Sequence, residues 1–554
     1  MRVGVGLWCL QSSALRPRPF PALYSELLED ARHAEAVGLD SLWLSEHHFF
    51  YDGYCPALLP AAAAALSVTQ RLRVGTGVLL LPLQAADRVA RAAAHLAESS
   101  GGRFDLGVGA GYREIEYLGK GLEFADRLSR MRAGLDALQG SPAPRWVGVS
   151  TPAAARRAGR RGLGLFLSGA FPPTVVRQMI QEHRQAWHQA GEPGEGRPPV
   201  GLLRNVWLAD DEGARAQARE WARSSYVVYA GLGWSATAAG MDFAAQVDAS
   251  MQEVVDGAIV GSADEVAEAV AAFPEIDLLV CRIGYDLPPR SAVLEVMERI
   301  GTELVPRLAS LGAANEQKAP PLPPPQPGPV PIGIAQLVTR NRQGPPAGLP
   351  PPPTSNDRRI CLELSPAEPL SAGPSGAELS RHDDLDLLVA RAIAAENAGI
   401  YAVLVGGGPG TETLRAAAVA AHTRWIRIVV RLHLDHEDPV TLAEEIAVLD
   451  NLTNGRVMVL ADADAGGHDG HDGHDGHNDL ALLRAALQGQ EVRGVTISPP
   501  PVQPALEIWR VGEEPLARLG WQGDPIDLAR RGAPPVVAAL AERFLRSEGA
   551  HVDQ

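Results

Sequence analysis

The sequence predicts an α/β protein whose first part is a (β/α)8 barrel. Apolar, strand-like segments alternate with helix-like segments over residues 1–310, and eight strand-like segments occur there. The segment 72–81 is almost entirely apolar, which is typical of a parallel strand that is covered on both faces. Eight such repeats in roughly 300 residues match the usual size of this barrel. An open, doubly wound sheet is the competing architecture.

The predicted strands are short apolar segments, at 2–8, 40–44, 72–81, 103–109, 144–149, 163–168, 201–209 and 277–283. The predicted helices alternate with them, at 22–37, 57–69, 84–99, 123–138, 152–161, 173–190, 213–228, 262–272 and 291–309. The first helix carries Leu23, Leu27 and Ala31 on one stripe, which is helical spacing. Segment 229–258 is longer than a barrel connection needs, and we expect a lid over the site there.

The chain has 554 residues, too many for one hydrophobic core, so we expect at least two domains. Proline runs at 320–325 and 350–353 mark the boundary. Consecutive prolines favour extended backbone and act as semi-rigid spacers. The sequence therefore predicts a barrel domain over 1–318, a Pro-rich linker over 319–356 and a second domain over 357–554.

The second domain is a weak copy of the first. Residues 73–111 and 427–466 both contain an apolar strand, a helix, a glycine-arginine step and a second strand, in that order. A repeat of this length indicates two related units. Because 357–554 is too short for eight β/α units, we expect a truncated, degenerate barrel-like domain.

A stretch rich in histidine, aspartate and glycine interrupts the second domain at 466–478. Histidine and carboxylate groups can bind zinc, copper or nickel loosely. The many glycines, however, would keep such a site from being preorganised. We favour a disordered insertion and predict no metal site.

Composition excludes several classes of protein. The formal net charge of -16 argues against an extended nucleic-acid or anionic-membrane surface. No apolar stretch is long enough to span a bilayer, and the N-terminal residues are expected to form a strand rather than a signal peptide. Four cysteines lie far apart with no C-x-x-C pair, which fits a reducing compartment. We expect a cytoplasmic protein that binds neither nucleic acid nor membrane.

The second predicted strand runs directly into Glu46, His47 and His48. In a (β/α)8 barrel the carboxyl ends of the strands converge where chemistry is placed. Histidine titrates near neutral pH and suits proton transfer at such a place. By this pattern alone, the two histidines are equally well explained as ordinary loop residues.

Three further strand ends carry features of a ligand site. Gly77 and the glycine-rich end at 107–111 would allow a ligand to approach the backbone closely. Ser150 or Thr151 is well placed to cap a helix, and the amino end of a helix binds phosphate readily. Tight packing and a plain helix cap explain the same residues.

Four segments resemble the bacterial luciferase-like family of flavin-dependent oxidoreductases, in family order and at similar spacing. They are WLSEHHF at 43–49, VGTGVLLLP at 74–82, GRFDLGVGAGY at 102–112 and VGSADEV at 260–266. Each segment alone is weakly specific, whereas the ordered set is specific. The resemblance covers residues 1–310 well and 357–530 faintly.

The resemblance implies a barrel that holds flavin at the carboxyl ends of its strands. His47 matches the family's histidine near the flavin ring, which is linked to the flavin hydroperoxide, so His47 is the candidate catalytic residue. Gly77 and Val78 match a place where the family often has a non-proline cis peptide under the ring. Cofactor contacts are also implied at Gly109, Ala110, Gly111, Tyr112, Val149, Ser150 and Thr151. Luciferase itself has an arginine in place of Ala110, and Arg113 is a nearby candidate substitute.

The resemblance implies a flavin-dependent monooxygenase that takes reduced FMN from a separate flavin reductase and uses dioxygen to oxygenate a small organic substrate. Two alternatives stay open. One is a hydride-transfer oxidoreductase that uses a 5-deazaflavin coenzyme on the same barrel. The other is a flavin-binding protein without turnover.

In the second domain, Gly408 and Arg431 align with His47 and Gly77. A long charged side chain at Arg431 would fill flavin space, so we expect 357–554 to bind no flavin. Its expected role is structural, standing against the barrel as the non-catalytic subunit of a luciferase does. This would make the chain a pseudo-dimer within one polypeptide; a homodimer is the alternative.

Overall fold

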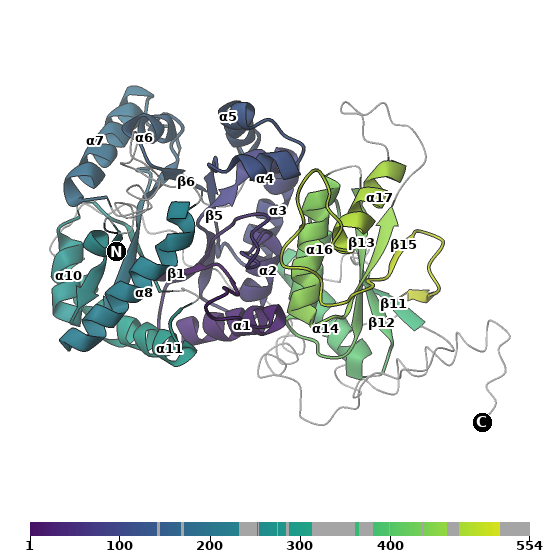
Figure 1. Ribbon diagram of the computed structural model, residues 1–554. Helices are drawn as coiled ribbons and strands as arrows, with labels where there is room; N and C mark the ends of the chain where they lie inside the picture. Colours follow the sequence, from purple (N-terminus) through teal and green to yellow (C-terminus); the bar gives the residue numbers. More distant parts are fainter. Residues whose placement is uncertain are drawn as a thin grey trace, which may run out of the picture.

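The computed structural model describes residues 1–140, 145–167, 171–194, 196–231, 252, 254–273, 275–283, 287–312, 360–364, 381–397, 399–434, 437–462 and 476–520. Two parallel sheets lie side by side within them, the first in the purple-to-teal half of the chain and the second in the green-to-yellow half (Figure 1). The expected linker over 319–356 lies outside the described residues. Most of the expected lid at 229–258 and most of the stretch at 466–478 lie outside them too.

The first sheet closes on itself. In the described part of the chain it contains eight strands in barrel order: β1 (Arg2–Trp8), β2 (Ser41–Leu44), β3 (Arg73–Thr76), β5 (Phe104–Gly109), β6 (Arg145–Val149), β7 (Gly164–Leu167), β8 (Val200–Leu208) and β10 (Leu278–Arg282). Neighbouring strands are parallel, and β10 pairs with both β1 and β8. The predicted (β/α)8 barrel is confirmed, and the open-sheet alternative is wrong.

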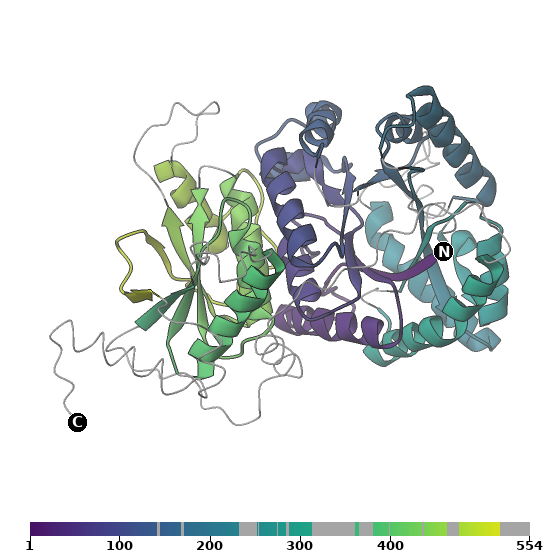
Figure 2. The same ribbon diagram turned by 180° about the vertical axis from the view of Figure 1, so that it is seen from behind.

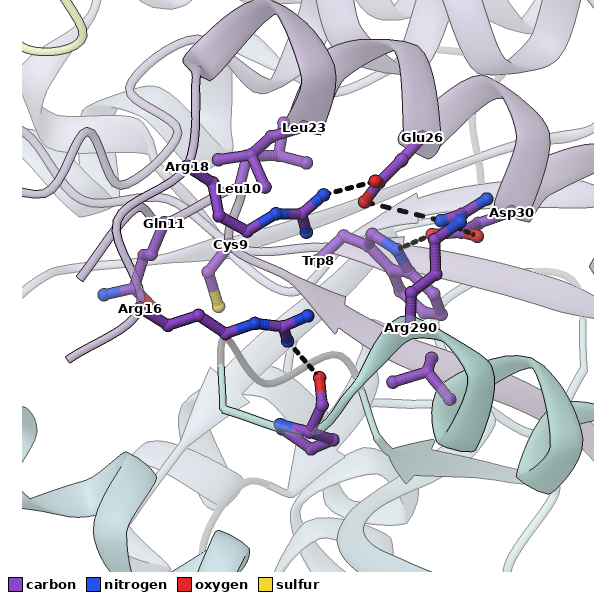
Figure 3. Close-up of a pocket in the computed structure, with 12 residues that line it drawn as sticks. Trp8, Cys9, Leu10, Gln11, Arg16, Arg18, Leu23, Glu26, Asp30 and Arg290 are labelled. Atoms are coloured by element: carbon purple, nitrogen blue, oxygen red, sulfur yellow. Dashed lines mark hydrogen bonds and ion pairs between the residues drawn. The ribbon is translucent and has the colours of Figure 1, made fainter.

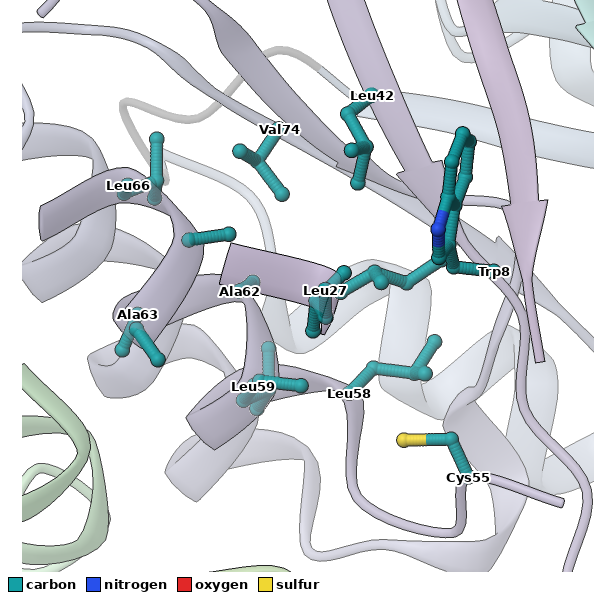
Figure 4. Close-up of a cluster of buried hydrophobic side chains, with 14 of the residues drawn as sticks. Trp8, Leu27, Leu42, Cys55, Leu58, Leu59, Ala62, Ala63, Leu66 and Val74 are labelled. Carbon is teal, nitrogen blue, oxygen red and sulfur yellow. The ribbon is translucent and has the colours of Figure 1, made fainter. Parts of the chain in front are cut away.

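Helices alternate with the strands: α1 (Phe20–Ala36), α2 (Leu58–Ser67), α3 (Ala86–Ser99), α4 (Glu114–Gly119), α5 (Arg127–Ala137), α6 (Pro152–Gly159), α7 (Pro173–Gln189), α8 (Glu212–Gly231), α10 (Ala263–Ala271), α11 (Arg290–Arg299) and α12 (Val305–Gly312). Figure 4 shows Leu27 of α1 and Leu58 of α2 beside Leu42 and Val74 of β2 and β3. This apolar layer between helices and strands is buried and holds the strand ends in place.

The strand predicted at 72–81 is broken, and this break lies at the candidate site. β3 ends at Thr76, and β4 (Leu79–Leu80) resumes the pairing with β5 two residues later. At the break, the hydroxyl of Thr76 donates to the carbonyl of Gly107 over 2.7 Å and accepts from its amide over 2.9 Å. The side chain thus replaces the backbone hydrogen bonds that a continuous strand would make.

Other differences from the predicted elements are small. α4 was not predicted, because a helix of six residues is too short to show a periodic apolar stripe. The helix predicted at 291–309 contains a π-helical turn at Ile300–Leu304 between α11 and α12. There, a Cβ on Gly301 would lie 2.2 Å from the carbonyl oxygen of Val37, so glycine allows this turn to pack against the end of α1. A short extra strand, β9 (Ile259–Gly261), extends β8.

The second sheet is open. Its six strands in the described residues follow the order β15 (Ile508–Arg510), β14 (Val457–Asp462), β13 (Arg427–His433), β12 (Ala402–Val405), β11 (Ile360–Leu364) and β16 (Ala517–Gly520), and all pairs are parallel. Its helices are α14 (Arg381–Asn397), α15 (Glu412–Ala420), α16 (Pro439–Thr453) and α17 (Gly476–Leu487). The predicted truncated barrel is confirmed, in the form of an open half-barrel.

The internal repeat extends to single side chains. In each unit a glutamate at the end of the first helix holds the backbone just before the third strand, which is β3 in the first unit and β13 in the second. Glu35 and Glu396 each accept hydrogen bonds there from three successive backbone amides. Each unit also has an arginine, the buried Arg103 or the partly exposed Arg456, that donates to a threonine hydroxyl and to backbone carbonyls at the same place. Equivalent clamps at equivalent positions show that the two units share one architecture.

The two units pack through equivalent helices. α2 lies against α15, α3 against α14, and α1 against α16, and both views show these helices in the middle of the molecule (Figures 1 and 2). Since α14, α15 and α16 occupy the places of α1, α2 and α3 in their unit, the packing is that of two units related by a pseudo-two-fold axis. Every residue from 58 to 66 in α2 and from 412 to 420 in α15 is buried.

A buried ion pair crosses this interface. Arg88 of α3 donates two hydrogen bonds to the carboxylate of Glu445 in α16, over 2.8 and 2.7 Å. The carboxylate of Glu437 lies 3.7 Å from Arg88, and the hydroxyl of Thr413 donates to Glu445 over 2.8 Å. Burial lowers the pKa of Arg88, but these carboxylates outweigh it and raise the pKa above its usual value.

The four cysteines are buried and free. Across the described residues, none of the helices is both long enough and apolar enough to pass through a bilayer.

We expect Arg88→Met to lower the free energy of unfolding by roughly 3–5 kcal/mol, because it leaves Glu445 and Glu437 buried without their cation. Urea denaturation measures the change. The control is Arg91→Met on the same helix, since Arg91 pairs with the exposed Asp87 and should cost less than about 1 kcal/mol. Equal losses in the two variants would contradict the importance of the buried pair.

Candidate active site

The candidate site lies at the carboxyl ends of β2, β3, β5 and β6, which are neighbours in the barrel. All the site residues predicted from the sequence are the last residue of one of these four strands or lie shortly after it, so the fold brings their backbone to one end of the barrel. Glu46, His47 and His48 follow β2 and are 2%, 5% and 0% exposed. They are therefore part of the packed interior at the barrel mouth and not loop residues in solvent.

His47 is held by two elements that follow β5. Its Nδ1 lies 2.8 Å from Oε1 of Glu116 in α4, and its Nε2 lies 3.3 Å from the hydroxyl of Tyr112. The rings of Phe50 and Tyr54 pack around the imidazole, with centroids 5.1 and 4.8 Å away. The ring is thus fixed in orientation, with Nδ1 turned to the carboxylate and Nε2 to Tyr112.

Glu116 was not predicted, and it is the residue that orients His47. Burial raises the pKa of Glu116, but His47, His48 and Arg113 outweigh it and lower the pKa to about 2. The carboxylate is therefore ionised and accepts, so Nδ1 of His47 donates. Oε1 also accepts from the backbone amide of His48 over 3.1 Å and from Arg113 over 3.0 Å.

His48 lies between two carboxylates. Its Nε2 is 2.7 Å from Glu46, and its Nδ1 is 2.7 Å from Glu444, which belongs to α16 in the second unit. Burial and the nearby Lys120 lower the pKa of His48, but Glu444 and Glu46 outweigh them and raise it to about 9. At neutral pH His48 is therefore an imidazolium that donates from both nitrogens.

Gly77 and Val78 lie at the break between β3 and β4, and the peptide bond between them is cis, as the resemblance implies. The side chain of Val78 lodges between two strands at glycines. A Cβ on Gly109 would lie 2.5 Å from it, and one on Gly148 would lie 3.2 Å from it. Gly77 and Val78 remain partly exposed, so their backbone is at the surface of the mouth.

The residues after β5 divide into two groups. Ala110, Gly111 and Tyr112 are partly exposed, whereas Gly109 is buried beneath Val78. Arg113 is not directed to a ligand: it donates to the carbonyl of His48 over 2.9 Å and to Glu116, and it lies over the ring of Phe50. Its charge therefore helps to hold the histidine loop, and its role as a substitute for the missing arginine stays a prediction.

The end of β6 forms the amino end of α6. Thr151 is the N-cap, and its hydroxyl accepts from the amide of Ala154 over 3.2 Å. Ser150 and Thr151 are exposed, and Val149 is 2% exposed. The sequence left the choice of cap open between Ser150 and Thr151, and the structure assigns it to Thr151.

These residues fit a flavin. The residues Gly77, Val78, Ala110 and Gly111 are partly exposed at the mouth, and the small side chains at 77, 110 and 111 suit contact with a planar ring. The exposed hydroxyls and amides at the start of α6 suit a phosphate. The predicted contacts at Gly109 and Val149 are buried, so they would support the site from beneath.

A separate cavity of about 70 Å³ opens beside β1 and α1 (Figure 3). Arg16, Arg18 and Arg290 line it, and each is engaged: Arg18 with Glu26, and Arg290 with Asp30 over 2.7 Å. Arg16 donates to the carbonyl of Pro288. None of the predicted site residues lines this cavity.

The model of the luciferase-like monooxygenase family matches the chain at residues 1–141, 134–277 and 365–484. These segments cover both units and more than half of the chain. The chain belongs to the luciferase-like monooxygenase family. The resemblance that the four sequence segments suggested is confirmed, including its faint part in the second unit.

The named relatives include a monooxygenase, a flavin-dependent monooxygenase component and an F420-dependent dehydrogenase. The chain is 34% identical over 137 residues to 4-hydroxyprotoasukamycin monooxygenase of Streptomyces nodosus subsp. asukaensis. This alignment covers 25% of this chain and 37% of the relative. It is 22% identical over 306 residues to the oxygenase component of the flavin-dependent trigonelline monooxygenase of Acinetobacter baylyi. This alignment covers 48% of this chain and 82% of the relative. It is 30% identical over 172 residues to the F420-dependent glucose-6-phosphate dehydrogenase of Amycolatopsis mediterranei. This alignment covers 25% of this chain and 52% of the relative. The chain thus spans only part of the first and last of these.

The second luciferase-like unit has different groups at its strand ends. Arg431 in β13 takes the place of Gly77, and its guanidinium lies 2.6 Å from the carboxylate of Asp462 at the end of β14. Nε2 of His433 lies 3.3 Å from the carbonyl of Gly407, next to Gly408. Charged side chains thus stand where the first unit has glycine and partly exposed backbone.

Two residues of the site were missed by sequence reasoning, Glu116 and Glu444. Glu116 lies on a helix too short to show periodicity. Glu444 and Glu445 left a signal, because they are adjacent carboxylates in the otherwise largely apolar segment 439–453. Acidic residues on a helix without a polar face must be paired when it folds, but the partner cannot be read from spacing alone.

We expect His48 to make stability fall at high pH. Its pKa of about 9 in the folded protein exceeds the ordinary value of 6.5, so its contribution is full below pH 6.5 and is lost as the pH rises through 9. The loss corresponds to about 3 kcal/mol. Urea denaturation at pH 6 and pH 10 should show a steeper fall for the wild type than for His48→Gln. Parallel curves for the two proteins would refute this assignment.

Proposed function

We propose that the first unit is a flavin-dependent monooxygenase that uses reduced FMN and dioxygen to oxygenate a small organic substrate. The observation that carries the proposal is the pairing of His47 with Glu116 beside the open backbone of Gly77 and Val78. An oriented imidazole and partly exposed backbone lie at one barrel mouth. The names of the Streptomyces and Acinetobacter relatives support this choice of reaction.

Each residue has a distinct role in the proposed site. Gly77, Val78, Ala110 and Gly111 would carry the flavin ring, supported from beneath by Gly109 and Val149. The bound reduced flavin supplies electrons for the reaction with dioxygen. His47 holds or moves a proton at Nε2, because Nδ1 is committed to Glu116. The hydroxyl of Tyr112 lies 3.3 Å from Nε2 in the structure and would yield that position to the ligand.

The phosphate would lie at the amino end of α6, near Ser150 and Thr151. Pro152 has no amide hydrogen and the amide of Ala154 is bonded to Thr151, so the support for an anion there comes from the helix dipole. Thr151 is committed to capping, whereas Ser150 is exposed.

The reduced flavin would come from a separate flavin reductase. The Acinetobacter relative is an oxygenase component by name, which supports a division of the reaction between two proteins. A deazaflavin-dependent hydride-transfer enzyme is the second candidate, and the F420-dependent relative supports it. On that reading the His47 imidazole would act on a substrate hydroxyl.

Binding and dioxygen consumption distinguish the candidates. We expect the protein to bind reduced FMN more tightly than the deazaflavin coenzyme and to consume dioxygen with it. His47→Ala should keep FMN binding and lose turnover by a factor on the order of a hundred. Turnover with the deazaflavin coenzyme alone would favour the second candidate, and binding without any turnover would favour a non-catalytic flavin protein.

A charge at Ser150 tests the position of the phosphate. We expect Ser150→Asp to weaken FMN binding at least about tenfold, because a carboxylate would repel the phosphate. Binding of riboflavin, which has no phosphate, should change little and serves as the control. Fluorescence quenching measures both affinities. An equal loss for both ligands would place the phosphate elsewhere.

A further inference from the structure

The cavity beside β1 and α1 is large enough for a small organic ligand. Its volume of about 70 Å³ gives room for roughly five water molecules. Trp8, Cys9 and Gln11, at and just after the end of β1, line one side of it. The cavity therefore lies at the same end of the barrel as the candidate active site.

Three guanidinium groups surround this cavity. Figure 3 shows Arg16 and Arg18, from the segment between β1 and α1, and Arg290, the first residue of α11. The side chains of Arg18 and Arg290 are 21% and 24% exposed. A ligand can therefore reach these groups, while water screens their charge less than it would on an open surface.

The two carboxylates that line the cavity are already matched. Oδ2 of Asp30 accepts from the indole of Trp8 over 2.9 Å, and its Oδ1 lies 2.7 Å from Arg290. One oxygen of Glu26 pairs with Arg18, and the other lies 3.5 Å from Arg290. Among the lining residues three cations face these two carboxylates, so the lining has one positive charge in excess.

Arg18 keeps hydrogen-bond donors for a further partner. A guanidinium carries five N–H groups and can hold a carboxylate by two parallel hydrogen bonds. Within the described residues the side chain of Arg18 donates from Nη2, to Glu26, and from no other nitrogen. Arg290 is used more fully, by Asp30 and by Glu29, an exposed residue outside the lining. The donors thus favour an anionic oxygen ligand on the Arg18 side.

Apolar side chains cover another part of the lining. Leu10, Leu23 and Val293 are 6%, 7% and 8% exposed, and all three line the cavity. A short hydrocarbon chain would bury apolar surface against them, whereas an inorganic anion would gain nothing there. The lining as a whole therefore suits a carboxylate that carries a short hydrocarbon chain.

Two side chains stand between this cavity and His47. The thiol of Cys9, which lines the cavity, lies 3.2 Å from the hydroxyl of Tyr54. The ring of Tyr54 packs edge-on against the imidazole of His47, with the centroids 4.8 Å apart. A ligand in the cavity would adjoin the candidate active site without reaching His47, so it is a molecule other than the organic substrate.

We propose that this cavity is a second binding site, which takes a short-chain carboxylate. The carboxylate lies against Arg16 and Arg18, and its hydrocarbon chain lies against Leu10 and Leu23. The proposal does not depend on the reaction at His47, because binding at the cavity requires no turnover.

Calorimetric titration with sodium propionate tests the site. We expect saturable binding at constant ionic strength. Propionamide, a neutral analogue of similar size, should bind at least about tenfold more weakly, because it lacks the charge that the guanidinium groups recognise. Sulfate should also bind more weakly than propionate, because it has no hydrocarbon chain. Equal affinity for propionate and propionamide, or no saturable binding of propionate, would overturn the proposal.

Two substitutions test where the anion lies. Arg16→Gln and Arg18→Gln should each weaken propionate binding at least about tenfold, because each removes a charged donor from the lining. The matched control is Arg161→Gln, which removes an arginine from a pair with Asp136 outside the cavity and should leave the affinity unchanged. Wild-type affinity in both cavity variants, or the same loss in all three proteins, would place the anion elsewhere.

A titration of the wild type loaded with FMN requires no variant. The affinity for propionate should stay within about twofold of that in the flavin-free protein, since the two ligands occupy different places. Displacement of FMN by propionate would put the anion in the flavin site and overturn the proposal. If FMN does not bind, the proposed function fails, whereas the titration of the flavin-free protein with propionate still decides the second site.

Discussion

Helices α2 and α15 have no face left for solvent, and this constraint determines how the two halves of the chain fit together. In each, one side lies on its own sheet and the other side lies on the partner helix. α2 is apolar along its buried length, and α15 is apolar apart from Glu412, Thr413 and Arg415 near its start. A helix with so little polar surface is stable in water only when it is covered on all sides. An open half-barrel therefore cannot leave α15 uncovered, and the barrel covers it with the helix at the equivalent position.

The buried charges follow from the same constraint. An interface made of alanine and leucine side chains stabilises contact but discriminates poorly between registers of one helix along another. Arg88 with Glu445, and Lys120 with Glu444, are buried, so each charge must meet its partner or cost several kcal/mol. A shift by one helical turn would separate both pairs. The ion pairs therefore fix the register, and the register brings Glu444 to His48.

The sequence predicted those parts of the fold that depend on local pattern. The barrel strands were found within one or two residues, because a strand covered on both faces is apolar along its length. The break after Thr76 was not found, because a threonine hydroxyl that replaces a backbone hydrogen bond leaves no mark in the apolar pattern. The open form of the second sheet was also beyond the sequence, since closure depends on which strands meet and not on how each is composed.

The candidate site was predicted to a similar extent and for a similar reason. At each strand end the site residues lie within one short stretch of sequence that contains glycine, hydroxyl or histidine residues. These residues could therefore be predicted from the sequence. Glu116 and Glu444 act on the histidines from 69 and 396 residues away. A contact of that kind becomes visible only when the fold places the two elements together.

The two units are alike at the amino ends of their strands and differ at the carboxyl ends. The clamps of Glu35 and Glu396 lie toward the amino ends, which in this fold serve stability, and both units have them. The carboxyl ends serve chemistry, and there the units differ: the second has Arg431 where the first has Gly77. What the second unit keeps is thus the half of the architecture that forms helices and docks them. The helix that docks the second unit also brings the carboxylate of Glu444 to His48.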